Sequence, residues 1–288
     1  MTKIAVIVFA ALAAAFLAAR PSPSPPPMPS DARSLAARVA AHPTDWAAAS
    51  ALTEKALDMP VRDRFALWHA ANGIAASMAP SLPEPRVTFA RSGFFHWLEL
   101  SAADRKKVLD AYAPQLRDPV SFSRMNHEVF ALTGDLDYLR RVRPPGIDAA
   151  GSLAWLAATY GRFDDYRSIR AEIEARGEAQ PPTPPAGVER ERWIGLCGEN
   201  ICASAWREIS AARSVTIALK TIETDEVVPY VEVYVDGVRR AEGELQRERT
   251  FVAEVDTPGL HQVEVRLANR LTRNNVPRRI RVMSVRAV

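Results

Sequence analysis

Two clusters of prolines divide this chain into parts that cannot share one run of regular structure. Of its 22 prolines, six lie within residues 21–29 and four within residues 181–185. Proline fixes its own φ and donates no backbone hydrogen bond, so such runs favour an extended spacer over a helix. The clusters predict five parts: an N-terminal segment over 1–20, a spacer over 21–29, a domain over 30–178, a linker over 179–190 and a domain over 191–288.

The first part is an apolar segment. Residues 4–19 carry no charged side chain, with Lys3 before them and Arg20 after them. Their number lies between the roughly 7–15 residues of a signal-peptide core and the roughly 20 of a membrane-spanning helix. A signal peptidase that cut after Ala19 would have Leu17 at the −3 position, where leucine fits poorly. A proline-rich spacer would hold a folded domain away from a membrane-embedded segment, whereas it would have little use inside a core. We therefore favour an uncleaved anchor over a cleaved signal peptide or a buried core helix.

The two cysteines of the chain, Cys197 and Cys202, lie close together in sequence with no histidine nearby, so they do not indicate a structural zinc site. In an exported protein such a pair is typical of a short-loop disulfide, and two buried thiols are the alternative. With the apolar segment, the pair predicts a single-pass protein of the inner membrane. It would contact the membrane through residues 4–19 and have its folded body on the periplasmic or extracytoplasmic side.

Apolar residues in 30–178 recur with the period of a helix. We expect an N-cap at Ser30-Asp31, a break at the prolines between 80 and 85, and a helix that begins at Ser101. Other helices are expected over about 61–78, 119–132, 135–142, 149–160 and 163–176.

Two of these helices end at a glycine, Gly134 and Gly161, and a short segment that contains aspartate follows each glycine. The segment 161–166 weakly resembles the turn inside a tetratricopeptide repeat, but the two glycines are closer together than the roughly 34 residues of such repeats. The pattern indicates a degenerate array of helical hairpins. Arrays of this kind usually hold partners.

Residues 191–288 change to the period of strands, with alternation over 215–221, 231–235 and 263–267. Asp236-Gly237 indicates a tight hairpin turn, and the alternation slips at Met283, which suggests a bulge. The pattern predicts an antiparallel β-sandwich and makes the whole chain an α+β multidomain protein. Trp193 and Trp206 flank the cysteine pair; they either fill the core, which we favour, or stack on sugar rings.

The segments 231–237, 258–265 and 267–269 resemble the calcium-dependent xylan-binding class of carbohydrate-binding modules. The resemblance implies a β-sandwich that holds sugar hydroxyls partly through calcium in loops at one end. Degenerate helical repeats followed by such a sandwich also resemble accessory proteins of bacterial envelope polysaccharide systems, including regions associated with O-antigen ligases.

The loop after Asn269 departs from that family, because arginines stand where acidic calcium ligands belong. We therefore expect no metal and no other cofactor. Guanidinium groups bind carboxylates and phosphates, so an acidic glycan or a lipid head group is favoured over a neutral xylan-like polymer as the ligand. Alternatively, these arginines pair with acidic residues of the neighbouring strands. The candidate ligand-binding residues are Asn269, Arg270, Arg273, Asn274, Asn275, Arg278, Asp225 and Glu226.

No histidine pattern of a zinc protease, no Gly-x-Ser-x-Gly and no glycine-rich phosphate loop is present, and the net charge of +3 does not indicate nucleic acid. We therefore expect no enzymatic activity. Two hypotheses remain. The protein is a membrane-tethered binding protein that contacts an envelope polysaccharide or its assembly machinery, or it is a scaffold whose helices hold a membrane-protein partner and which binds no glycan.

Overall fold

The computed structural model describes residues 27–60, 62–177, 182–188, 190, 192–197, 200–222 and 226–288, without the side chains of 196 and 197. The apolar segment 4–19 lies outside this part of the chain. Within the described part, no helix combines the length and apolar character needed to cross a membrane. The chain divides into two compact units, one that ends at Tyr112 and one that begins at Ala113. The domain boundaries expected from the prolines stay predictions.

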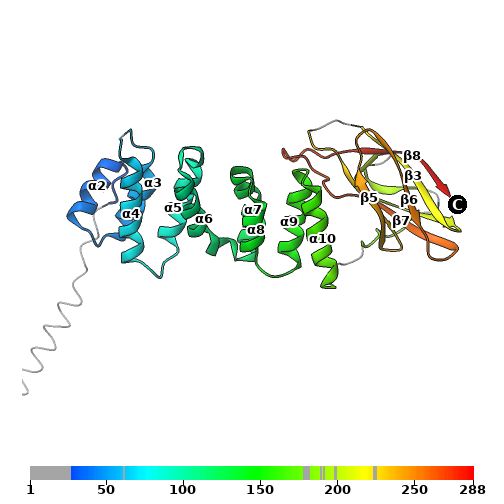
Figure 1. Cartoon of the computed structure of the whole chain (residues 1–288), viewed down its shortest axis with the longest axis horizontal. Helices are drawn as coiled ribbons and strands as arrows, with labels where there is room; N and C mark the ends of the chain where they lie inside the picture. The colour runs from blue at the N-terminus through cyan, green and yellow to red at the C-terminus, as the bar shows by residue number, and fades with distance from the viewer. Residues whose placement is uncertain are drawn as a thin grey trace, which may run out of the picture. The chain divides into compact units, whose positions relative to one another are not determined.

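The first unit is helical (Figure 1). It contains α2 (Ala32–Ala41), α3 (Trp46–Ala56), α4 (Arg64–Met78), α5 (Glu84–Phe95), the 3-10 turn η1 (Trp97–Glu99) and most of α6 (Ala102–Leu116). The expected cap at Asp31 is confirmed, because its carboxylate accepts a hydrogen bond from the Ser34 N–H at 2.8 Å. Helix α5 was not expected. It follows Pro83 and holds Pro85 in its first turn, where a missing N–H costs nothing.

The main core of the first unit lies between α2, α3 and α4, and a second group of buried residues lies where α4, α5 and α6 meet. Trp68 is fully buried and stacks on Phe89 with ring centroids 4.1 Å apart, and its indole N–H donates to Ser92 Oγ at 2.8 Å. Gly93 lies on the same face of α5, where a Cβ would come within 2.3 Å of Val108 Cγ2 on α6. These helices therefore approach each other too closely for a larger residue at that position.

The second unit begins with four further helices. Gly134 and Gly161 have φ of +66° and +72°, the left-handed conformation expected at both turns. The helices expected in this region are confirmed, with ends within two residues of the predicted ones. They are α7 (Pro119–Thr133), α8 (Leu136–Val142), α9 (Ile147–Thr159) and α10 (Phe163–Ala175).

Eight antiparallel strands follow in one sheet of order β5-β4-β7-β2-β8-β3-β6, with β1 paired to β2. Among the described residues, two pairs of β2 and β8 join its two halves, Asn200↔Arg281 and Ile201↔Ile280, and the end strands β5 and β6 lie near each other. The sheet is therefore nearly closed around its core, and the α+β class with an antiparallel sheet is confirmed. The strands are β1 (Ile194–Cys197), β2 (Asn200–Ala211), β3 (Ser214–Thr221), β4 (Tyr230–Val235), β5 (Val238–Glu244), β6 (Glu248–Glu254), β7 (Gly259–Leu267) and β8 (Ile280–Ala287).

Two local features of the sheet confirm the sequence expectations. Asp236-Gly237 forms the two-residue turn between β4 and β5, with positive φ at both residues. The register between β3 and β8 shifts opposite Met283, which is the extra residue of a bulge.

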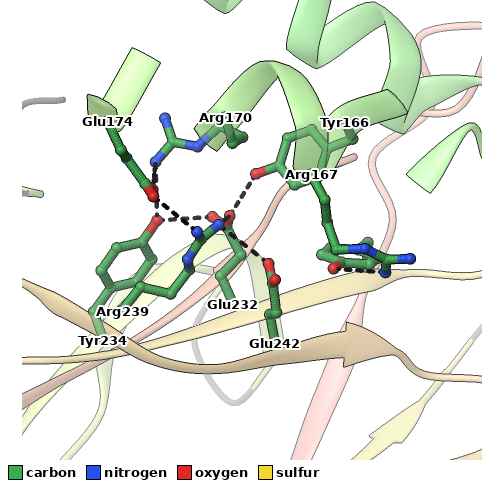
Figure 2. A network of polar contacts seen from close by, with 9 residues as sticks. Tyr166, Arg167, Arg170, Glu174, Glu232, Tyr234, Arg239 and Glu242 are labelled. Carbon is green, nitrogen blue, oxygen red and sulfur yellow. Dashed lines mark hydrogen bonds and ion pairs between the residues drawn. The ribbon is translucent and has the colours of Figure 1, made fainter. Parts of the chain in front are cut away.

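Helix α10 covers the outer face of β4, so both faces of this strand are buried. Glu232, which is 1% exposed, points from β4 towards α10 and accepts hydrogen bonds from the hydroxyls of Tyr166 at 2.5 Å and Tyr234 at 3.0 Å (Figure 2). Arg239 on β5 then pairs with Glu174 at 3.1 Å and with Glu232 at 3.5 Å. This buried network holds the last helical hairpin against the sheet. Because protein groups enclose the Glu232 carboxylate, we interpret the network as a structural contact.

Candidate ligand-binding site

The arginine-rich loop between β7 and β8 uses two of its candidate residues for its own structure. The buried side chain of Asn269 accepts a hydrogen bond from the Tyr230 N–H at 2.8 Å and donates to the Val228 carbonyl at 2.9 Å. Arg278 is 3% exposed and donates to the carbonyls of Val227 at 3.2 Å and Asn269 at 2.8 Å. Both side chains hold neighbouring loops together, and ligand binding by them stays a prediction.

The remaining candidates of that loop lie on the surface. Arg273 packs over the Tyr160 ring at 4.8 Å from its centroid and pairs with Glu226 at 3.5 Å, so it contacts the end of α9. Asp225 lies outside the described residues. In the β7–β8 loop, the side chains of Asn269, Arg273 and Arg278 all contact other groups of the protein. Exposed in the same loop are Arg270, Asn274 and Asn275.

The cysteine pair lies at the hairpin of β1 and β2. The backbone of Cys197 pairs with Asn200, and Cys202 is buried on β2. The side chain of Cys197 is outside the described part, so the disulfide between Cys197 and Cys202 stays a prediction.

A different site emerges where β2 and β8 separate. Beyond the pair Ile201↔Ile280, β2 has no further described pairs with β8 and pairs instead with β1 and β7. The gap forms a cleft of about 660 Å³. It is lined by Arg192, Trp193, Ile201, Arg207, Arg281, Val282, Met283, Ser284 and Val285.

Arg207 is one of three arginines that line this cleft. Its cross-strand partner is Val263, which belongs to the buried core, so the arginine side chain extends from the inner face of β2. The core residues Ala205 and Ile209 lie on either side of it along that face. Its Nε is buried without a hydrogen-bond partner, and it forms no ion pair with any described residue.

Trp193 lies one residue before the first β1–β2 pair, Ile194↔Trp206, and therefore next to Arg207. Its ring packs against the core of the sheet, as the sequence favoured for both tryptophans, whereas Trp206 lies on the opposite face of β2. The indole N–H of Trp193 is buried without a partner and borders the cleft. An apolar ring, two kinds of N–H donor and fixed positive charge thus meet at one place. This arrangement can hold a polar ring compound.

The sequence analysis did not select Arg207 or Arg281. A signal was present, because an arginine at an inward position between Ala205 and Ile209 interrupts the apolar face of β2. That signal can be used only if the inward face of β2 is known. Because polar residues lie on both faces of the strand, the sequence does not identify the inward face. Among the described residues, no cluster of histidine, cysteine, aspartate or glutamate could hold a metal ion.

No protein-family model and no curated protein matches the chain. Solved structures with some likeness include an acetyl xylan esterase from the rumen bacterium Butyrivibrio proteoclasticus, 12% identical with a TM-score of 0.23, which covers 30% of this chain and 24% of the esterase. A family 35 carbohydrate binding module from an environmental isolate is 15% identical with a TM-score of 0.22, over 38% of this chain and 87% of the module. A 4-O-methyl-α-glucuronidase with specificity for decorated arabinogalactans is 11% identical with a TM-score of 0.25, over 83% of this chain and 41% of the enzyme. With TM-scores this low, these likenesses carry no argument about fold or function.

Proposed function

We propose that the protein is a non-catalytic binding protein of the cell envelope whose sheet binds a polysaccharide, with residues 4–19 as its membrane tether. The cleft beside Trp193 carries the proposal. Its volume of about 660 Å³ lies in the usual range of ligand pockets, roughly 300–1,000 Å³. A partly buried indole at its border offers an apolar face for a sugar ring and a free N–H for a hydroxyl.

Retention of the full chain on immobilised bacterial and plant polysaccharides tests this proposal. We expect Trp193→Ala to weaken retention at least tenfold. Trp206→Ala is the matched control, because Trp206 lies on the same strand pair but faces Glu264 on β7, away from the core. Both variants are first compared with the parent by circular dichroism. Equal retention of the parent and Trp193→Ala would show that the cleft is not the glycan site.

The tether is tested separately with a reporter that is active only in the periplasm, fused after residue 30. An active fusion that stays in the membrane fraction supports an uncleaved anchor. An active fusion in the soluble periplasm shows cleavage, and an inactive fusion contradicts export.

A specific observation favours the second candidate, a scaffold whose helices hold a membrane-protein partner without glycan binding. Phe95 and Leu98 are 81% and 88% exposed at the end of α5 and on η1, only three positions apart. Large apolar side chains exposed this fully often mark protein contacts. A photo-crosslinking amino acid at Phe95 is expected to give one discrete membrane-protein adduct that Leu98→Asp abolishes. Absence of any adduct contradicts the scaffold.

A further inference from the structure

The cleft between β2 and β8 is rich in positive charge. Arg192, Arg207 and Arg281 line it, and its described lining residues include no aspartate or glutamate. Arg207 and Arg281 form no ion pair with any described residue. Elsewhere in the same unit, arginines such as Arg239 and Arg266 are matched by buried carboxylates. Arg207 and Arg281 therefore differ from these two arginines, whose charge is compensated within the protein.

The buried part of Arg207 lacks a hydrogen-bond partner, which is costly. Its Nε has no hydrogen-bond partner and is shielded from solvent, between Ala205 and Ile209 of the core. Leaving a buried donor unpaired costs on the order of 1–3 kcal/mol, and more for a charged group. The Trp193 N–H nearby is a second buried donor without a partner. Two unsatisfied donors at one cleft are the arrangement expected when a ligand supplies the acceptors.

Resting on the glycan-binding function proposed above, we infer that this cleft selects sugars that carry a carboxylate, the uronic acids. The carboxylate accepts hydrogen bonds from the Arg207 guanidinium, with Arg281 supplying further positive charge. The planar guanidinium matches the two oxygens of a carboxylate. The sugar ring lies against Trp193, whose N–H donates to a ring or hydroxyl oxygen. This site is separate from the arginine loop at 270–279, where Arg278 is already occupied by carbonyl groups.

Binding of the full chain to polygalacturonate and to its methyl ester tests this inference, because esterification adds only a methyl group and removes the charge of the carboxyl group. Titrations are made at about 150 mM salt, where exposed charges are largely screened. We expect the uronate polymer to bind at least tenfold more tightly than the ester. Arg207→Gln, which keeps a polar side chain without the charge, is expected to abolish that preference. Inorganic phosphate as a competitor distinguishes a carboxylate-selective cleft from a general anion site.

Arg247→Gln is the matched control, because it removes one exposed positive charge outside the cleft. If it weakens uronate binding as much as Arg207→Gln does, attraction is general and the inference is wrong. Competition by millimolar phosphate would equally overturn selectivity for uronates. If the acid polymer and its ester bind equally, the inference fails while the proposed glycan-binding function stands. If no polymer, acidic or neutral, is retained, both fail together.

Discussion

The hydroxyl of Tyr166 on α10 donates a hydrogen bond to the carboxylate of Glu232 on β4 at 2.5 Å, across 66 residues of sequence. Burial and the neighbouring negative charge of Glu232 raise the pKa of the Tyr166 hydroxyl, which therefore keeps its proton and remains the donor. Glu232 can accept from Tyr166, Tyr234 and Arg239 together, so its charge is shared by three donors.

Removing this contact is expected to destabilise the second unit. Tyr166→Phe deletes one donor and should lower the free energy of unfolding by about 1–2 kcal/mol, measured by urea denaturation of the full chain. In a double-mutant cycle with Glu232→Gln, we expect a coupling energy of at least about 0.5 kcal/mol, since the two groups contact each other directly. Strictly additive effects would mean that the hydroxyl and carboxylate do not interact in solution.

His261 gives the sheet a pH-dependent stability. Its Nδ1 contacts Asp236 Oδ2 and its Nε2 contacts the Thr257 carbonyl, both at 2.7 Å, so both ring nitrogens act as donors when the ring is protonated. The hydrogen bond to Asp236 raises the pKa of His261, and Thr257 and Asp256 act in the same direction, against the desolvation of the buried ring. Protonated His261 therefore stabilises the folded state.

The stabilisation by His261 should be complete below its unfolded pKa of about 6.5 and disappear as pH rises through the higher folded pKa. Thermal unfolding of the parent and of His261→Gln between about pH 5.5 and 9 measures this effect. We expect the difference between their midpoints to be largest at the acidic end. A difference that grows with pH would show that the neutral ring is the stabilising form.

Gly93 tests the close packing of α5 against α6. A Cβ at this position would lie 2.3 Å from Val108 Cγ2, whereas Gly73 on α4 has open space around its Cβ position. Gly93→Ala should lower stability by about 1–3 kcal/mol through overpacking, while Gly73→Ala should raise it by up to about 1 kcal/mol through helix propensity. Urea denaturation compares both variants with the parent, and a stabilising Gly93→Ala would contradict the packing described.

Asn269 tests the structural role of the β7–β8 loop. Asn269→Ala leaves the Tyr230 N–H and the Val228 carbonyl without their partner, so we expect a loss of about 1–3 kcal/mol. Asn274→Ala in the same loop is exposed and should stay within about 0.5 kcal/mol of the parent. Chemical denaturation decides; equal effects of the two substitutions would leave no special role for Asn269.

Most of the fold could be predicted from local sequence signals. Caps, glycine turns and strand alternation depend on a few neighbouring residues, and so the cap at Asp31, the turn at Gly161 and the bulge at Met283 were predictable. Helix α5 was missed because the prolines before it were read as a break, although Pro85 suits the first turn of a helix.

Long-range relationships were not predictable in the same way. The alternation of Tyr230, Glu232 and Tyr234 resembles a solvent-facing row, and only the position of α10 shows that this row is buried. The cleft likewise depends on where β2 leaves β8, which no sequence period reports. Asn269 and Arg278 drew attention as polar loop residues, and the structure shows them bonded to carbonyl and amide groups of neighbouring chain segments.

The burial of Glu232 under α10 limits where this protein can be cut into fragments and where recombination can join part of it to another protein. Cutting at the prolines around residue 180 would separate Tyr166 from Glu232 and uncover a carboxylate and two tyrosines on a flat strand face. An unmatched surface of this kind invites self-association. Gene shuffling would meet the same barrier, so the piece that can move between proteins intact begins before α7 and carries its last helices along with the sheet.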